Sequence, residues 1–268
     1  MAGNGGGHGP PATALWQLQL LGAWSLRRAG TPVPIRHREQ RLLAVLALHG
    51  GHPRQYIAGL LWPESTDSHA AGNLRAAVWN LDRAAPGLLI HDRTHIQLAD
   101  GASVDVGHLM DATRDLLAPR ALGHADVDYF ALLHTLLREE LLPGWYDDWL
   151  ILERSRLQEL RQQALEQLSD LLSERGDIPT ALQAARAAVA IEPLRESAQR
   201  SLIIVHIRAG NHSDAVRCYA DFRSRIRGEL GVRPSGQLES LVSPLVGTMP
   251  PGRSLEGAFV RSGSDRRR

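Results

Sequence analysis

The hydrophobic pattern at the start of the chain has the period of β-strands. Residues 16–20 alternate apolar and polar side chains, as expected of a half-buried strand, and residues 24–26 continue this pattern. A turn at residues 28–30 separates them from Val33 and Ile35, which predict a short return strand. The chain therefore begins with a small antiparallel sheet.

Three segments with helical periodicity follow. Residues 36–48 place their apolar side chains on one face, and residues 54–61 form a shorter segment that ends before Pro63. The third segment begins after Ser65 or Thr66, whose hydroxyl can cap the free amides of the first turn. It ends before the helix-breaking pair Pro86–Gly87, so the sequence predicts three short helices in a row.

A hairpin is predicted directly after the third helix. Residues 88–90 and 96–98 are two short apolar runs, and the five residues between them are polar. A strand cluster, three helices and a hairpin, in that order, are typical of a winged helix-turn-helix of the response-regulator effector type.

Beyond Gly101 the pattern is helical almost throughout. Helices are expected over residues 105–117, 128–142 and 147–175. An internal repeat follows, because Gly176–Asp177 recurs as Gly210–Asn211 after 34 residues, the period of tetratricopeptide repeats. The second half is therefore predicted to be an all-α repeat domain.

The end of the repeat is expected to differ from its beginning. Pro193 and Pro234 each follow a helix as a breaker, but they lie 41 residues apart, so the last helix must be longer. Stacked helix pairs form a concave scaffold for partners rather than a catalytic pocket.

The expected fold is mainly α, with an N-terminal winged helix-turn-helix that includes a small β-sheet and a wing hairpin, followed by an all-α TPR-like repeat domain. We expect the winged-helix domain over residues 14–100 and the repeat domain over residues 104–246. Residues 1–13 and 247–268 are rich in glycine, proline or arginine and are expected to be disordered tails.

The composition of the chain indicates its cellular compartment. The chain has 268 residues, of which 43% are hydrophobic and 22% charged, and its apolar runs are too short to cross a membrane. Its start lacks the features of a secretory signal. Cys218 is the only cysteine, which excludes an internal disulfide and a cysteine-cluster zinc site. We therefore expect a cytoplasmic protein that has no contact with membranes.

The charged residues exclude some enzyme classes. The chain has no lysine, so neither a P-loop nor a Schiff-base enzyme is possible. The net charge of +1 does not by itself indicate a nucleic-acid binder. Arginine suits bidentate contacts to phosphate and guanine, although a codon bias explains its abundance equally well. Because the sequence shows no clustered carboxylate or histidine motif, we expect that the protein is not an enzyme and binds neither a cofactor nor a metal.

Several motifs resemble a known family. The segments Leu60–Pro63, Leu142–Trp149, Glu192–Glu196 and Arg227–Pro234 are similar to those of the SARP-type regulators of antibiotic biosynthesis. These proteins pair an OmpR-like winged helix with a bacterial transcriptional activator domain, and the resemblance covers roughly residues 15–246.

The resemblance implies binding to double-stranded DNA, with the third helix in the major groove and the wing near the minor groove. It also implies protomers that self-associate on direct repeats beside a promoter and recruit RNA polymerase. The third helix departs from the family because it carries Asp82 where relatives often have arginine. Its outward face is expected to include the small residues Ala76 and Ala77, so that few side chains remain to read bases.

The candidate DNA contacts lie on the third helix and around the wing. Leu74, Val78 and Leu81 share the inner face of that helix, which leaves the other faces to solvent or the groove. Asparagine can hold adenine and arginine can hold guanine or phosphate, but a plain solvated face has the same composition. The predicted contacts are Asn73, Arg75, Ala76, Asn80 and Arg83 of the third helix, Arg54 at the start of the second, and Arg93 and Thr94 at the wing tip.

Other conspicuous residues have structural interpretations. Trp79 is expected to be buried. His91 and His95 are not expected to converge on a metal, because they bracket a hairpin rather than share a helix face. The aromatic cluster Trp145–Trp149 is expected to pack between the domains, with an interface to polymerase or a second protomer as the alternative.

Three other functions remain open. The first is a TPR-type interaction scaffold whose DNA-binding domain is degenerate, which the weak net charge and the small residues on the third helix favour. The second is a regulator that senses a small molecule or peptide in its repeat domain. The third is a hydrolase, which is the weakest alternative because the sequence shows no catalytic motif.

Overall fold

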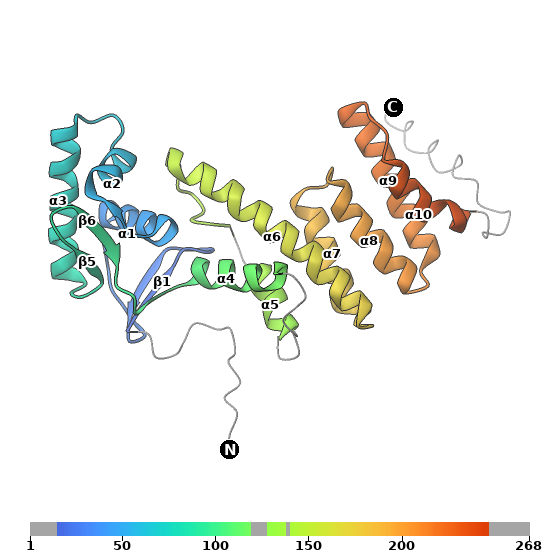
Figure 1. The fold of residues 1–268 in the computed structure, drawn as a ribbon, viewed down its shortest axis with the longest axis horizontal. Helices are drawn as coiled ribbons and strands as arrows, with labels where there is room; N and C mark the ends of the chain where they lie inside the picture. Colours follow the sequence, from blue (N-terminus) through green and yellow to red (C-terminus); the bar gives the residue numbers. More distant parts are fainter. Residues whose placement is uncertain (1–14, 119–127, 138–139, 247–268) are drawn as a thin grey trace, which may run out of the picture. The chain divides into compact units, whose positions relative to one another are not determined.

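A computed structural model of the chain describes residues 15–118, 128–137 and 140–246. These residues form two compact units, one up to Leu168 and one from Ser169 onward. Figure 1 shows the winged helix in the first unit and the last four helices in the second. Both predicted tails lie outside the described residues, and the predicted domain boundaries stay predictions.

A four-stranded sheet opens the first unit. Its order is β3–β2–β1–β7, formed by Thr31–Pro32, Ser25–Arg28, Trp16–Gln19 and Ala102–Val104. β1 to β3 are antiparallel as predicted, whereas β7 joins β1 in parallel and was not foreseen. The predicted position of the return strand was wrong by two residues, although the Val33 amide still donates to the carbonyl of Leu26 in β2.

The three predicted helices of the winged helix are confirmed. They are α1 (His37–His49), α2 (Arg54–Leu61) and α3 (Asp67–Ala84). The Thr66 hydroxyl caps α3 by accepting from the His69 amide. Residues Leu42–Leu46 of α1 are buried and α1 packs on α2 and α3, so burial of apolar surface holds the three helices together.

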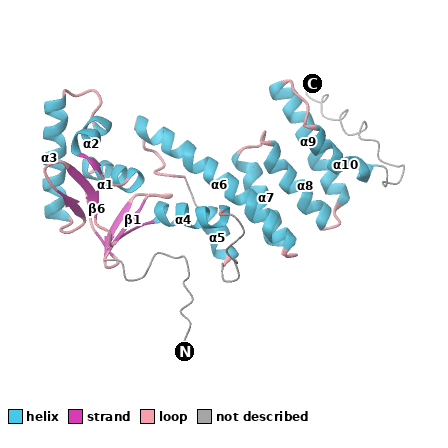
Figure 2. Cartoon of the chain, viewed as in Figure 1, coloured by secondary structure: helices cyan, strands magenta, loops and turns pink. Residues whose placement is uncertain are grey.

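The predicted hairpin is confirmed as well, and it belongs to a second sheet. β5 (Leu89–His91) and β6 (His95–Leu98) are antiparallel, and the two-residue strand β4 (His52–Pro53) pairs with β6. Figure 2 shows this sheet beside α3. Ile96 is fully buried and anchors the hairpin, which is the wing of the fold.

Three helices complete the first unit: α4 (Asp105–Leu117), α5 (Tyr129–Leu136) and the first part of α6 (Asp148–Glu174). The prediction of one helix over residues 128–142 was wrong in extent. Leu142 has a φ of 45° and donates its amide to the carbonyl of Leu20, so the chain there leaves the helical conformation to bond with the end of β1.

Four helices form the second unit together with the end of α6. They are α7 (Ile178–Ile191), α8 (Glu196–Arg208), α9 (His212–Leu230) and α10 (Gly236–Val246), and each contacts the next. This confirms the all-α repeat. α9 has 19 residues against 14 in α7, which agrees with the longer last helix that the spacing of the prolines predicted.

The repeated turns are structurally equivalent. Gly176 and Gly210 have φ values of 84° and 73°, a region that suits glycine. The residue after each glycine, Asp177 or Asn211, occupies the N-cap position of the next helix. The 34-residue repeat is therefore a repeated turn geometry as well as a repeated sequence.

Candidate nucleic-acid interface

The core of the first unit fixes which face of α3 reaches solvent. Leu74, Val78 and Leu81 are at most 4% exposed, as predicted, and α3 packs on both α1 and α2. Ala77 is also fully buried. The prediction that Ala77 faces outward was wrong, because Ala77 lies on the same side of α3 as Leu74, Val78 and Leu81.

Between Arg75 and Arg83 the exposed residues of α3 form one stripe: Arg75, Ala76, Trp79, Asp82 and Arg83. Trp79 is 58% exposed, so the prediction of a buried tryptophan was wrong. Its spacing of four residues from both Arg75 and Arg83 puts all three side chains on one helix face. That spacing is the signal in the sequence that identifies Trp79 as part of the surface.

The two predicted asparagines of α3 bond to α1. Asn73 Oδ1 accepts a hydrogen bond of 2.6 Å from Arg38, and Asn80 Nδ2 donates one of 2.8 Å to Glu39, which is 3% exposed. An asparagine that holds adenine uses both its amide nitrogen and its amide oxygen. In this structure these amides join α3 to α1, and their predicted base contacts stay predictions.

The wing tip is built around one carboxylate. Asp92 Oδ1 accepts from the Thr94 amide (2.6 Å), the Thr94 hydroxyl (2.8 Å) and the His95 amide (2.7 Å). These hydrogen bonds stabilise the ionised form and lower the pKa of Asp92 to about 2. Thr94 therefore shapes the turn, and Arg93 at its centre is exposed to solvent.

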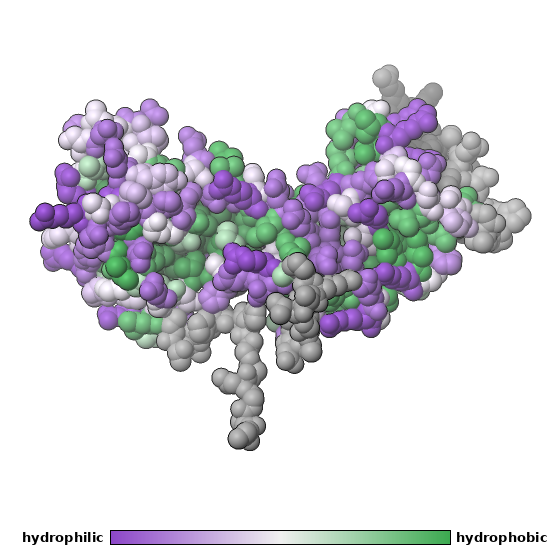
Figure 3. Space-filling model, in the orientation of Figure 1, coloured by the Kyte–Doolittle hydropathy of each residue, from purple (hydrophilic) through white to green (hydrophobic). Residues whose placement is uncertain are grey.

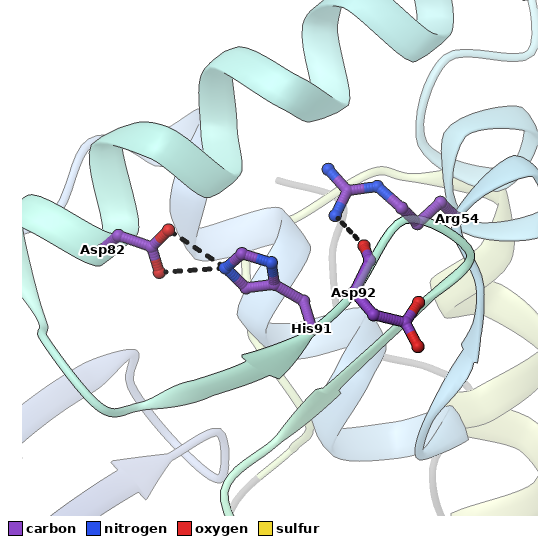
Figure 4. A network of polar contacts seen from close by, with 4 residues as sticks. All are labelled: Arg54, Asp82, His91 and Asp92. Carbon is purple, nitrogen blue, oxygen red and sulfur yellow. Dashed lines mark hydrogen bonds and ion pairs between the residues drawn. The ribbon is translucent and has the colours of Figure 1, made fainter.

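Two side chains tie the wing to the helices around it (Figure 4). His91 Nε2 of β5 lies 3.0 Å from Asp82 Oδ2 of α3, and Arg54 Nη1 of α2 donates to the carbonyl of Asp92. The Arg54 amide also donates to the carbonyl of Thr94 at 2.7 Å. Asp82 thus helps to hold the wing against α3.

We call the exposed stripe of α3 together with Arg93 of the wing tip the α3–wing surface. It carries three exposed guanidinium groups, those of Arg75, Arg83 and Arg93, and the carboxylate of Asp82, which is bonded to His91. The region of α3 in Figure 3 is mainly hydrophilic. A helix of this kind, with free arginines and a neighbouring wing, can reach both the phosphates and the base edges of duplex DNA. The predicted contact Arg54 is half-buried beside this surface.

The motif around Trp145 serves packing within the first unit. The Trp145 ring lies 4.6 Å from that of His37 and 6.0 Å from that of Trp24, measured between centroids. Asp147 accepts a hydrogen bond of 2.7 Å from Arg41 of α1. Tyr146 is 89% exposed and takes no part in this packing.

No group of three or more histidine, cysteine, aspartate or glutamate side chains gathers to hold a metal ion in the part of the chain that the structure describes. His91 and His95 have separate partners, Asp82 and Thr94. None of the helices among the described residues is both long and apolar enough to span a membrane.

Comparison with known proteins identifies a domain in the helical half of the chain. Residues 131–245 match the sequence profile of the bacterial transcriptional activator domain. Residues 131–245 therefore form a bacterial transcriptional activator domain, the domain that the resemblance to the SARP-type regulators predicted for the second half. The winged helix in front of that domain is the combination that the motifs of the sequence predicted, so the resemblance is confirmed.

Two curated relatives extend the similarity to the winged helix. The chain is 30% identical to regulatory protein AfsR of Streptomyces coelicolor over 91% of its own length, and 28% identical to regulatory protein AfsR of Streptomyces griseus over 86%. It spans about a quarter of the length of these relatives, covering 25% and 24% of them.

A solved structure has the same fold. Mycobacterium tuberculosis EmbR, in complex with a low affinity phosphopeptide, superposes with a TM-score of 0.71 at 20% identity. The match covers 88% of this chain and 66% of that one. At this identity the similarity supports the fold, a winged helix followed by a helical domain.

Proposed function

We propose that this chain is a sequence-specific DNA-binding regulator that activates transcription in the bacterial cytoplasm. The observation that carries the proposal is the exposed stripe of α3, whose buried face is held on α1 and α2 while Arg75, Trp79 and Arg83 reach solvent. The activator domain and the AfsR relatives support a regulatory role. Such a role requires neither catalysis nor a cofactor.

The dimensions of α3 suit the major groove, which is about 12 Å wide and admits one helix. Arg75 and Arg83 lie eight residues apart, about 12 Å along the helix axis. Each guanidinium can therefore contact a different base pair or phosphate. Arg93 is placed by the Asp92 turn at the wing tip, where an arginine can enter the minor groove.

The second half supplies the activating contact in this proposal. A stacked helical repeat offers a scaffold for protein partners, and RNA polymerase is the partner that the SARP resemblance implies. The same resemblance implies that protomers self-associate on direct repeats beside a promoter. These finer features rest on the resemblance and on the match to the activator domain.

One alternative is supported by specific observations. The net charge is only +1, and both asparagines of α3 bond to α1. These features favour an interaction scaffold whose winged helix no longer binds DNA.

The test is selection of fragments of bacterial genomic DNA by the purified full chain, followed by binding of the best fragment. The proposal predicts enrichment of a shared sequence. The double variant R75A/R83A should lose most of the preference for that sequence, because a good arginine–guanine pair contributes about 1–3 kcal/mol of discrimination.

A matched control is available in α9. Arg223 and Arg225 are exposed, and Arg223 lies over the ring of Tyr219 as Arg83 lies over that of Trp79. The variant R223A/R225A removes the same charge and should select the same sequence as the unaltered chain. If neither the unaltered chain nor the R223A/R225A variant enriches any sequence, the scaffold alternative is supported instead.

A further inference from the structure

Trp79 is the largest apolar group on the exposed stripe of α3. It is 58% exposed on a helix whose other large apolar side chains, Leu74, Val78 and Leu81, are buried. Exposing an indole to water forgoes the free energy that its burial would contribute. The folded first unit leaves more than half of the ring uncovered, so the ring is available to a binding partner.

Its surroundings identify the kind of partner. The Arg83 guanidinium lies 4.7 Å from the centroid of the indole ring, and Arg75 lies one helical turn away on the other side. The one exposed carboxylate beside them, that of Asp82, is bonded to His91 at 3.0 Å, so a protein partner for an apolar anchor would meet two cations next to it. A polyanion matches them, since the cations can neutralise phosphates while the ring between them reaches into the groove.

Within the major groove only one base offers an apolar group to such a ring. The edges of guanine, cytosine and adenine present hydrogen-bond donors and acceptors, whereas thymine also presents its C5 methyl group. The indole face is apolar, and its stacking with Arg83 leaves the opposite face for contact. In this structure the amides of Asn73 and Asn80 are bonded to α1 at 2.6 and 2.8 Å, whereas the ring of Trp79 is exposed.

We propose that Trp79 is a specificity-determining residue that reads thymine through an apolar contact between its ring and the C5 methyl group. This inference rests on the proposed function, because it places α3 in the major groove. It specifies which base the protein contacts, thymine, and which group of that base, the C5 methyl. Arg83 acts beside Trp79 as a positioning residue that holds the ring by stacking.

The experiment replaces each thymine of the selected site by uracil, one position at a time, which removes only the methyl group. Binding of the full chain should weaken about fourfold at one or two positions, the equivalent of roughly one buried methylene. With Trp79→Ala the same replacements should have no effect, because the partner of the methyl group is gone. Trp79→Phe keeps an apolar ring and should retain part of the penalty.

Tyr146→Ala is the control, since it removes an aromatic ring that is 89% exposed and lies outside α3 and the wing. It should show the same uracil penalties as the unaltered chain. Equal penalties in the unaltered chain and Trp79→Ala, or no penalty in either, would overturn the role of Trp79 while specific DNA binding stands. Failure to select any DNA would instead overturn the proposed function.

Discussion

Asp92 determines the shape of the wing tip through three hydrogen bonds to the two residues that follow Arg93. The backbone amides of Thr94 and His95 are held by its ionised carboxylate, so the arginine that precedes them is presented from a defined turn. A short polar loop is otherwise among the most mobile parts of a fold.

The pKa of Asp92 provides a direct prediction. It is lowered from the ordinary 3.8 to about 2 by these hydrogen bonds, so the ionised form is favoured by folding. The carboxylate therefore stabilises the turn at pH values above about 4, and this contribution is lost as the pH falls toward 2. The carboxyl carbon of Asp92, followed by NMR, should titrate with a midpoint near 2, and an ordinary midpoint would contradict the observed geometry.

A variant tests the same turn near neutral pH. Asp92→Ala should accelerate hydrogen exchange at the amides of Thr94 and His95, because both lose their acceptor. Asp100→Ala removes an exposed carboxylate just beyond the wing and should leave the exchange of these two amides unchanged.

At the scale of elements, Arg41 connects three segments of the first unit. It lies on α1, donates to the Leu61 carbonyl at the end of α2, and donates to Asp147 just before α6. Its side chain and that of Asp147 are 22% and 13% exposed, so the pair is well shielded from solvent. The end of α2 begins the turn that leads into α3, and Arg41 therefore helps to fix the helix-turn-helix.

Removing Asp147 should weaken this connection. We expect Asp147→Ala to lower the free energy of unfolding by about 1.5–3 kcal/mol, the usual contribution of a hydrogen bond to a charged group. Asp148→Ala changes the adjacent, exposed carboxylate and should cost less than about 1 kcal/mol, mainly through the dipole of α6. Urea denaturation of both variants compares them, and equal losses would contradict the role of the Arg41–Asp147 pair.

Two glycines of the helical repeat, one in a turn and one inside a helix, should change stability in opposite directions when replaced by alanine. Gly176 has a φ of 84°, and no atom lies within 4 Å of the position that a Cβ would take, so Gly176→Ala should destabilise by about 1–2 kcal/mol through backbone strain alone. Gly228 lies inside α9 with open space around it, and Gly228→Ala should stabilise by roughly 0.5–1 kcal/mol. Thermal unfolding measures both, and a loss at Gly228 would contradict the account.

At the scale of the whole molecule, the order of elements was predictable because their signals are local. The bounds of α2 and α4 follow from apolar periodicity and from breakers such as Pro63, and the repeat follows from two matching glycine turns. β4 was missed because two residues cannot show a period. β7 was missed because its partner β1 is distant in sequence.

The candidate site was harder to predict because the direction of a side chain depends on distant partners. Asn80 bonds to Glu39, 41 residues earlier, and no local pattern reveals that contact. Ala76 and Ala77 are chemically identical, yet only Ala77 is buried, and the packing of α1 and α2 decides which. Trp79 could have been recognised from its spacing to Arg75 and Arg83, but its chemistry alone favoured the core.

The measurement that tests the central claim most directly is the salt dependence of DNA binding by the full chain, on its selected sequence. If the α3–wing surface engages phosphates, the logarithm of the binding constant should fall linearly with the logarithm of salt, by about 0.9 for each phosphate neutralised. Arg93→Ala should reduce that slope by about 1, and Arg225→Ala should leave it unchanged. A flat response in the unaltered chain would contradict DNA binding and support the interaction scaffold.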